Sequence, residues 1–147
     1  SGIGKTVLVN ELQARISLQH GYFISGKFDQ LNHTQAYSAL SMALRMLIKQ
    51  LLSEPDNRLQ RWRQKILTAV EGNGELIIAL MPELNYLIGP QPPVQILSGV
   101  EAENRFKRVL QKFIQAFCDA SHALVLFLDD LQWADPASLS FLQQFIT

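Results

Sequence analysis

A continuous apolar run near the end of the chain restricts its fold more than any other feature. Residues 123–128 read ALVLFL, and two carboxylates, Asp129 and Asp130, follow at once. An apolar run of this length, without polar alternation, is typical of a strand that is buried on both faces of a parallel sheet. Parallel strands need crossover connections, which are usually helical. The run therefore predicts an α/β fold with the acidic pair at the carboxyl end of a strand.

The remaining sequence supplies the helices that such a fold needs. A short strand is expected at Tyr22, Phe23 and Ile24, and Asp135 followed by Pro136 is expected to cap and begin the last helix. The order of elements predicts a three-layer parallel sheet with a helical insertion between the two strands. Apolar periodicity or flanking glycine and proline residues indicate the other helices over residues 5–20, 38–52, 58–70, 75–81 and 101–120, and one after Pro82.

Composition limits the classes of partner. The 147 residues are enough for one domain, and the 13 basic residues are matched by 13 acidic ones, so the charge excess typical of nucleic-acid binding is absent. No apolar run approaches the roughly 20 residues that span a bilayer. The single cysteine, Cys118, allows no intrachain disulfide and fits a reducing cytoplasm. We therefore expect a cytoplasmic domain without a nucleic-acid or membrane partner.

The chain opens with SGIGKT, which matches the end of the phosphate-loop pattern G-x-x-x-x-G-K-[ST]. The first glycine would lie two residues before Ser1. Backbone N–H groups of such a turn form a concave nest for phosphate oxygens at the start of a helix. Lys5 would reach the β- and γ-phosphates, and the Thr6 hydroxyl would bind magnesium. The candidate nucleotide-binding residues are Ser1, Gly2, Ile3, Gly4, Lys5 and Thr6.

The acidic pair supplies what a phosphate loop lacks. Phosphoryl transfer needs a divalent ion, and an acidic side chain at the end of a neighbouring strand holds it. Adjacent strand residues point in different directions, so we assign Asp129 to magnesium and Asp130 to activation of the attacking water. Lys5 and Asp130 are then the candidate catalytic residues. The alternative interpretation is a strand ending in two solvated carboxylates, and the combined motifs favour a site for ATP and Mg²⁺ in which the opening turn and the acids meet.

The sequences SGIGKT and LVLFLDDLQWADPASLSFL together resemble the AAA-type ATPase module of the STAND class of signal-transduction ATPases. GYFISGKFDQ and ENRFKRVLQKFIQAF resemble versions found inside large bacterial multidomain serine/threonine and histidine sensor kinases. The resemblance covers the whole chain, residues 1–147, as a partial P-loop domain whose first strand would precede Ser1 and whose later strands would follow Thr147.

The resemblance implies phosphate contacts by Gly2, Gly4, Lys5 and Thr6, magnesium binding by Thr6 and Asp129, and a catalytic role for Asp130. Related ATPases often have glutamate at the position of Asp130, so the shorter aspartate implies slow, switch-like hydrolysis. Other domains of the parent chain, including kinase and sensor domains, are the implied partners besides ATP and ADP, and a nucleotide-dependent oligomer remains open. A nucleotide-holding scaffold without turnover, and another P-loop phosphotransferase or GTPase, remain the alternative functions.

Overall fold

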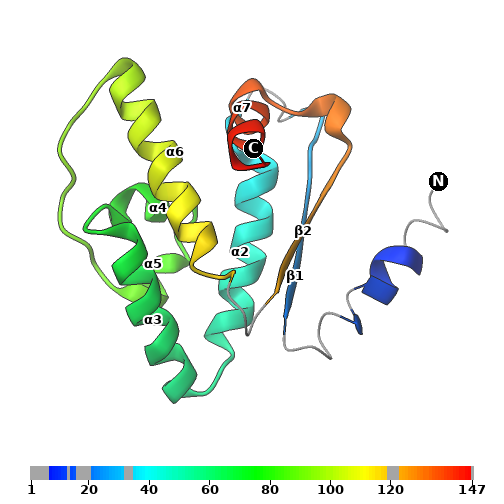
Figure 1. Ribbon diagram of the computed structural model, residues 1–147, viewed down its shortest axis with the longest axis horizontal. Coiled ribbons are helices and arrows are strands. Elements are labelled where there is room, and N and C mark those ends of the chain that lie inside the picture. Colours follow the sequence, from blue (N-terminus) through cyan, green and yellow to red (C-terminus); the bar gives the residue numbers. More distant parts are fainter. Residues whose placement is uncertain (1–6, 13, 16–20, 32–34, 119–122, 147) are drawn as a thin grey trace.

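The computed structural model describes residues 7–12, 14–15, 21–31, 35–118 and 123–146. Its sheet contains two parallel strands, β1 (Tyr22–Lys27) and β2 (Leu124–Asp129). They pair in one continuous register, from Tyr22 opposite Leu124 to Lys27 opposite Asp129. The parallel pairing brings the carboxyl ends of both strands to the same end of the molecule (Figure 1).

One long helix, α2 (Ser38–Leu52), packs on one face of this sheet. The contact is close because Gly26 has no side chain: a Cβ atom built there would lie 2.0 Å from the carbonyl oxygen of Ala39. The helical residues 7–12 and 14–15 lie on the other side of the strands (Figure 1). The strands are therefore sandwiched between helices, as the predicted three-layer α/β class requires.

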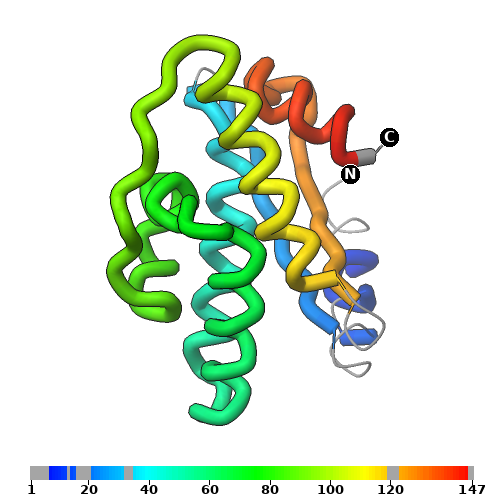
Figure 2. The backbone as a smooth tube through the Cα atoms, turned by 60° about the vertical axis from the view of Figure 1, so that its left-hand side comes forward, coloured from blue at the N-terminus to red at the C-terminus, as the bar shows by residue number. Residues whose placement is uncertain are grey.

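A set of helices covers the face of α2 that points away from the sheet (Figures 1 and 2). They are the insertion between the two strands: α3 (Asp56–Val70), α4 (Gly74–Leu80), α5 (Leu84–Ile88) and α6 (Gly99–Gln115). A short 3₁₀ turn η1 (Leu131–Trp133) and the last helix α7 (Pro136–Ile146) follow β2. The main core lies between α2, α3 and α6, and its fully buried members include Leu40, Leu44, Leu47, Ile66, Leu110 and Phe113.

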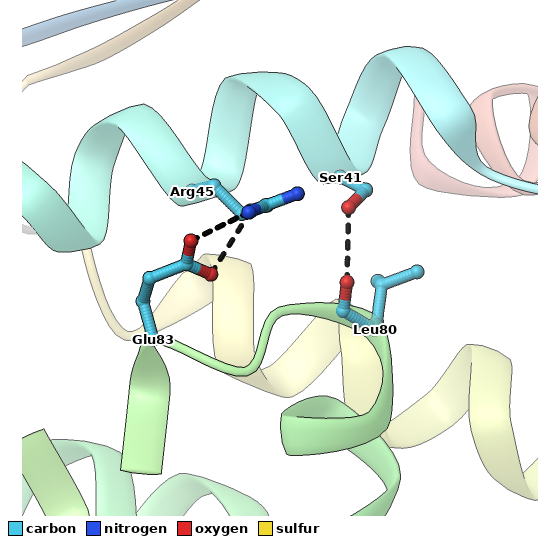
Figure 3. A network of polar contacts seen from close by, with 4 residues as sticks. All are labelled: Ser41, Arg45, Leu80 and Glu83. Carbon is cyan, nitrogen blue, oxygen red and sulfur yellow. Dashed lines mark hydrogen bonds and ion pairs between the residues drawn. The ribbon is translucent and has the colours of Figure 1, made fainter. Parts of the chain in front are cut away.

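Polar contacts fix α2 to the insertion at its exposed margin (Figure 3). The Ser41 hydroxyl donates a hydrogen bond of 2.9 Å to the carbonyl oxygen of Leu80. One helical turn further on, the Arg45 guanidinium donates to both carboxylate oxygens of Glu83, at 2.9 and 2.7 Å. Hydrogen bonding to Arg45 lowers the pKa of Glu83, so the carboxylate remains charged at neutral pH.

Most predicted elements are confirmed, with differences at the helix ends. The helix expected over 101–120 begins at Gly99 and ends at Gln115. It ends early because its last turn tightens: the Phe117 N–H donates to the carbonyl of Ile114, three residues back. The tightened turn leaves Phe117 fully buried, with its ring stacked on that of Trp62 at 5.2 Å. No helix among the described residues is long and apolar enough to cross a membrane.

Candidate functional site

The acidic pair ends β2, as the sequence predicted. Asp129 is the last strand residue, and its carbonyl oxygen accepts a hydrogen bond of 3.0 Å from the Phe28 N–H, just after β1. Its carboxylate oxygen Oδ1 accepts the N–H of Asp130 at 2.8 Å. Asp130 then leaves the strand in the left-handed conformation, with φ 57° and ψ 52°. The backbone therefore departs from strand geometry between the two residues, so strand alternation alone does not set the directions of their side chains.

Lys27 joins the acidic pair from the neighbouring strand. It lies opposite Asp129 in the register, and its Nζ atom is 3.4 Å from Oδ2 of Asp130. The lysine side chain is 65% exposed and that of Asp130 is 29% exposed, so the ion pair lies at the rim of the site. Sequence reasoning missed Lys27, although a cation at the carboxyl end of a predicted parallel neighbour was a usable signal.

A cavity of about 310 Å³ opens beside these strand ends. Asp129 and Lys27 line it from the sheet, and Met42 and Met46 line it from α2. Val9 and Asn10, from the helical residues near the start of the chain, complete its wall. Ser1, Gly2, Ile3, Gly4, Lys5 and Thr6 lie outside the described residues, so their predicted meeting with the acids stays a prediction. The helix that follows them in sequence does share this cavity with Asp129.

The segment after the acidic pair makes few contacts with the core. The 3₁₀ turn η1 closes through hydrogen bonds of 3.0 Å from the Trp133 N–H to the Asp130 carbonyl and from the Ala134 N–H to the Leu131 carbonyl. No residue of this turn is buried, and Leu131 and Trp133 are 56% and 36% exposed. The local hydrogen bonds therefore set the shape of the turn but do not anchor it to the rest of the molecule.

Asp135 follows this turn and is only 1% exposed. The predicted helix cap is confirmed: its Oδ2 accepts the Ser138 N–H at 2.8 Å, and its Oδ1 accepts the Ser138 hydroxyl at 2.8 Å. Oδ2 also accepts the backbone N–H of Tyr37 at 3.2 Å. Tyr37 is the cap residue of α2, so one carboxylate joins the starts of two helices. No local pattern could reveal this second contact, which links residues 98 positions apart.

No group of three or more His, Cys, Asp or Glu side chains in the described part of the chain, the acidic pair included, could hold a metal ion. The candidate site is the acidic strand end with its adjoining cavity. This arrangement offers hard carboxylate oxygens beside a concave space, as a magnesium–nucleotide complex requires.

Comparisons with known proteins show the family to which the chain belongs. The chain is 37% identical over 138 residues to "Hybrid signal transduction histidine kinase G" of Dictyostelium discoideum, and 27% identical over 154 residues to "Histidine protein kinase 1" of Candida albicans. Each match covers 94% of this chain but only 4% and 6% of the respective relatives, so the chain corresponds to a small part of much longer kinases. A comparison with solved structures gave no significant match. The family described as "AAA ATPase domain" matches residues 1–147, and the chain therefore belongs to this family.

Proposed function

We propose that this chain binds ATP together with Mg²⁺ and hydrolyses it slowly, as a nucleotide-dependent switch of the STAND type within a longer signalling protein. The observation that carries the proposal is the position of Asp129, which ends β2 and lines a cavity shared with the helix that follows SGIGKT. Membership of the AAA ATPase domain family over the whole chain supports it.

The opening sequence would bind the phosphates. Backbone N–H groups of residues 1–4 would form the anion nest, for which Gly2 and Gly4 leave room. The Lys5 ammonium would pair with the β- and γ-phosphates and orient them. The wall formed by Val9 and Asn10 supports this arrangement, because it brings the first helix to the cavity that Asp129 lines.

The strand end fits a magnesium ion chemically. Mg²⁺ is usually held by one or two carboxylates, together with hydroxyl groups, water and substrate phosphates, rather than by a cage of protein ligands. Thr6 and Asp129 would hold the ion. When bound, magnesium neutralises negative charge on the phosphates and supplies electrostatic stabilisation of the transferring group.

Asp130 would orient the attacking water and accept its proton. In the structure its Oδ2 atom is paired with Lys27 Nζ at 3.4 Å, so the lysine competes with water for this oxygen. The aspartate side chain is also short for reaching a water molecule beside the terminal phosphate. Both features favour slow hydrolysis, which suits a switch that remains in its ATP-bound state for many seconds.

The relatives suggest the setting of this switch. Both are named as histidine kinases, and this chain matches only a small part of each. We therefore propose that the partners of this domain are other domains of its own parent chain, including kinase and sensor domains. ATP binding would favour one arrangement of these domains, and hydrolysis would release it.

Single substitutions in the full-length parent protein test the proposal. Lys5→Ala should weaken ATP binding with and without magnesium, whereas Asp129→Asn should weaken only the magnesium-dependent part. Asp130→Asn should leave MgATP binding intact and abolish phosphate release. Asp56→Asn is the matched control, because Asp56 is an exposed carboxylate in the first turn of α3. Unchanged binding and turnover in all three site variants would refute the proposed site.

Two alternative functions predict different experimental results. A scaffold that holds nucleotide without using it would release phosphate at the same background rate in wild type and in Asp130→Asn. A GTPase would bind GTP more tightly than ATP, and isothermal titration of the full-length protein with both nucleotides measures this preference. Another phosphotransferase would consume ATP faster when its second substrate is present.

A further inference from the structure

The turn that carries the acidic pair is held at its two ends rather than along its length. Residues 130–134 contain no fully buried side chain, and Leu131 is more than half exposed. Pairing with β1 fixes one end, where the Phe28 N–H reaches the carbonyl of Asp129. The other end is fixed at Asp135, which is almost fully buried. The position of the turn therefore depends on what Asp135 contacts.

Asp135 contacts two different helices through one carboxylate. It caps α7 through the N–H and hydroxyl groups of Ser138, and its Oδ2 atom also accepts the N–H of Tyr37, at the start of α2. All three donors are neutral groups, and together they give a hydrogen bond to each oxygen of this buried side chain.

Tyr37 is itself tightly held. Its backbone is in the left-handed region, with φ 63°, and its side chain is 8% exposed. Its ring lies 5.0 Å from that of Phe106 in α6 and 6.2 Å from that of Phe141 in α7. The hydrogen bond from Tyr37 to Asp135 therefore connects the turn after β2 to the junction of α2, α6 and α7.

We propose that Asp135 is a positioning residue of the nucleotide site: its bond to Tyr37 fixes the segment after β2 against the start of α2, and thereby Asp130, whose N–H holds Oδ1 of the Asp129 carboxylate at 2.8 Å. This inference rests on the proposed magnesium–nucleotide function of the acidic pair and adds a residue to it. In this role Asp135 would touch neither nucleotide nor metal, because its carboxylate oxygens are held by Tyr37 and Ser138. It acts through the turn. A movement of the helical insertion at Tyr37 would therefore shift the turn and change the positions of the acidic side chains at the end of β2.

Three substitutions separate this role from ordinary helix capping. Asp135→Asn keeps an oxygen that can accept both backbone N–H groups. Asp135→Ser keeps a favourable cap for α7, but its hydroxyl is one bond too short to reach Tyr37 as well. Asp135→Ala loses both contacts. Ile66→Ala is the control for general destabilisation, because Ile66 is fully buried and belongs to α3, a helix that lies away from the carboxyl ends of the strands (Figure 1).

The experiment measures phosphate release by the full-length parent protein as a function of magnesium concentration. We expect Asp135→Ser and Asp135→Ala to raise the concentration for half-maximal release by about tenfold or more, as happens when a residue that orients a metal ligand is lost. Asp135→Asn should stay close to wild type. Ile66→Ala should melt at a lower temperature with unchanged magnesium dependence. If Asp135→Ala does not fold, Asp135→Ser decides the question alone.

A normal magnesium dependence in folded Asp135→Ser would overturn the inference and leave Asp135 as a helix cap only. Hydrogen exchange of the segment 129–135 gives a second readout that does not need nucleotide. Faster exchange in Asp135→Ser than in Ile66→Ala supports the positioning role even if the wild-type protein neither binds nor hydrolyses ATP, in which case the proposed function alone fails. Equal exchange in that case overturns the inference as well.

Discussion

Replacing Gly26 by alanine tests the packing that positions the strand ends against α2. The added Cβ atom would lie 2.0 Å from the carbonyl oxygen of Ala39, 2.9 Å from its carbonyl carbon and 3.3 Å from its Cα atom. All three are backbone atoms of a helix, so no side-chain rotation can relieve the clash. Ordinary contact begins near 3.4 Å, so α2 and β1 would have to separate by about 1.4 Å at this point.

The cost follows from what surrounds the contact. Ala39 and Leu40 are fully buried, and α2 lies between the sheet and the helical insertion, so the helix cannot move without disturbing packing on both sides. Overpacked core substitutions usually cost 1–3 kcal/mol, and we expect about 3 kcal/mol here because the obstacle is rigid. That loss corresponds to roughly 150-fold faster hydrogen exchange in β1 and α2.

Hydrogen exchange followed by mass spectrometry measures this effect in the full-length parent protein. Gly74→Ala is a matched control, since the Cβ atom there would meet only the flexible side chain of Gln91, at 2.6 Å from Cγ. We expect that control to change exchange by less than about tenfold, because the glutamine can move and alanine favours the helix. If Gly26→Ala exchanged at the wild-type rate, the close contact between β1 and α2 would be wrong.

Three further predictions concern stability. Glu83→Gln should lower the free energy of unfolding by about 0.5 kcal/mol at neutral pH. Urea unfolding should show this difference closing as the pH falls below the ordinary range of a glutamate and through the lowered pKa of Glu83, because the wild-type carboxylate then loses its charge and its pair with Arg45. Burial raises the pKa of Tyr22, and the nearby Glu54 carboxylate raises it further, so the stability that the neutral phenol contributes is lost as the pH rises above about 10. The melting temperature of Tyr22→Phe should therefore fall less steeply than that of the wild type at alkaline pH. Trp62→Ala should cost about 3–5 kcal/mol in the same urea experiment, because the ring is 6% exposed within the core.

The fold was predictable where one local pattern determines one element. The apolar run before Asp129 predicted a parallel strand, and the spacing of leucines over 38–52 predicted α2 with its observed bounds. The end of α6 was not predictable, because the tight turn there depends on burying Phe117 against Trp62 in another helix. Helix periodicity continues past the point at which tertiary packing ends the helix.

The residue types of the candidate site were predictable from the sequence, but the contacts that these residues make with distant segments were not. Asp129, Asp130 and the capping role of Asp135 follow from residue chemistry at the end of a strand and the start of a helix. The Lys27 pair depends on strand register, and the Tyr37 contact depends on how α2 meets α7. Both are consequences of pairing between distant segments: the sequence offered Lys27 as a cation at a predicted strand end, but the partner of each residue depends on register and packing that no local pattern encodes.

The pairing of β1 with β2 has a consequence during protein synthesis. Tyr22 meets Leu124 across about a hundred residues of intervening chain. At ordinary elongation rates β1 therefore leaves the ribosome about 5–20 s before its partner strand exists. The helices α2 to α6 can pack in that interval, because they contact one another over shorter stretches of sequence. The acidic strand end can therefore form only after β2 has been made, and until that moment the β2-facing edge of β1 lacks the partner that it has in the structure and is open to chaperones and to other copies of the chain.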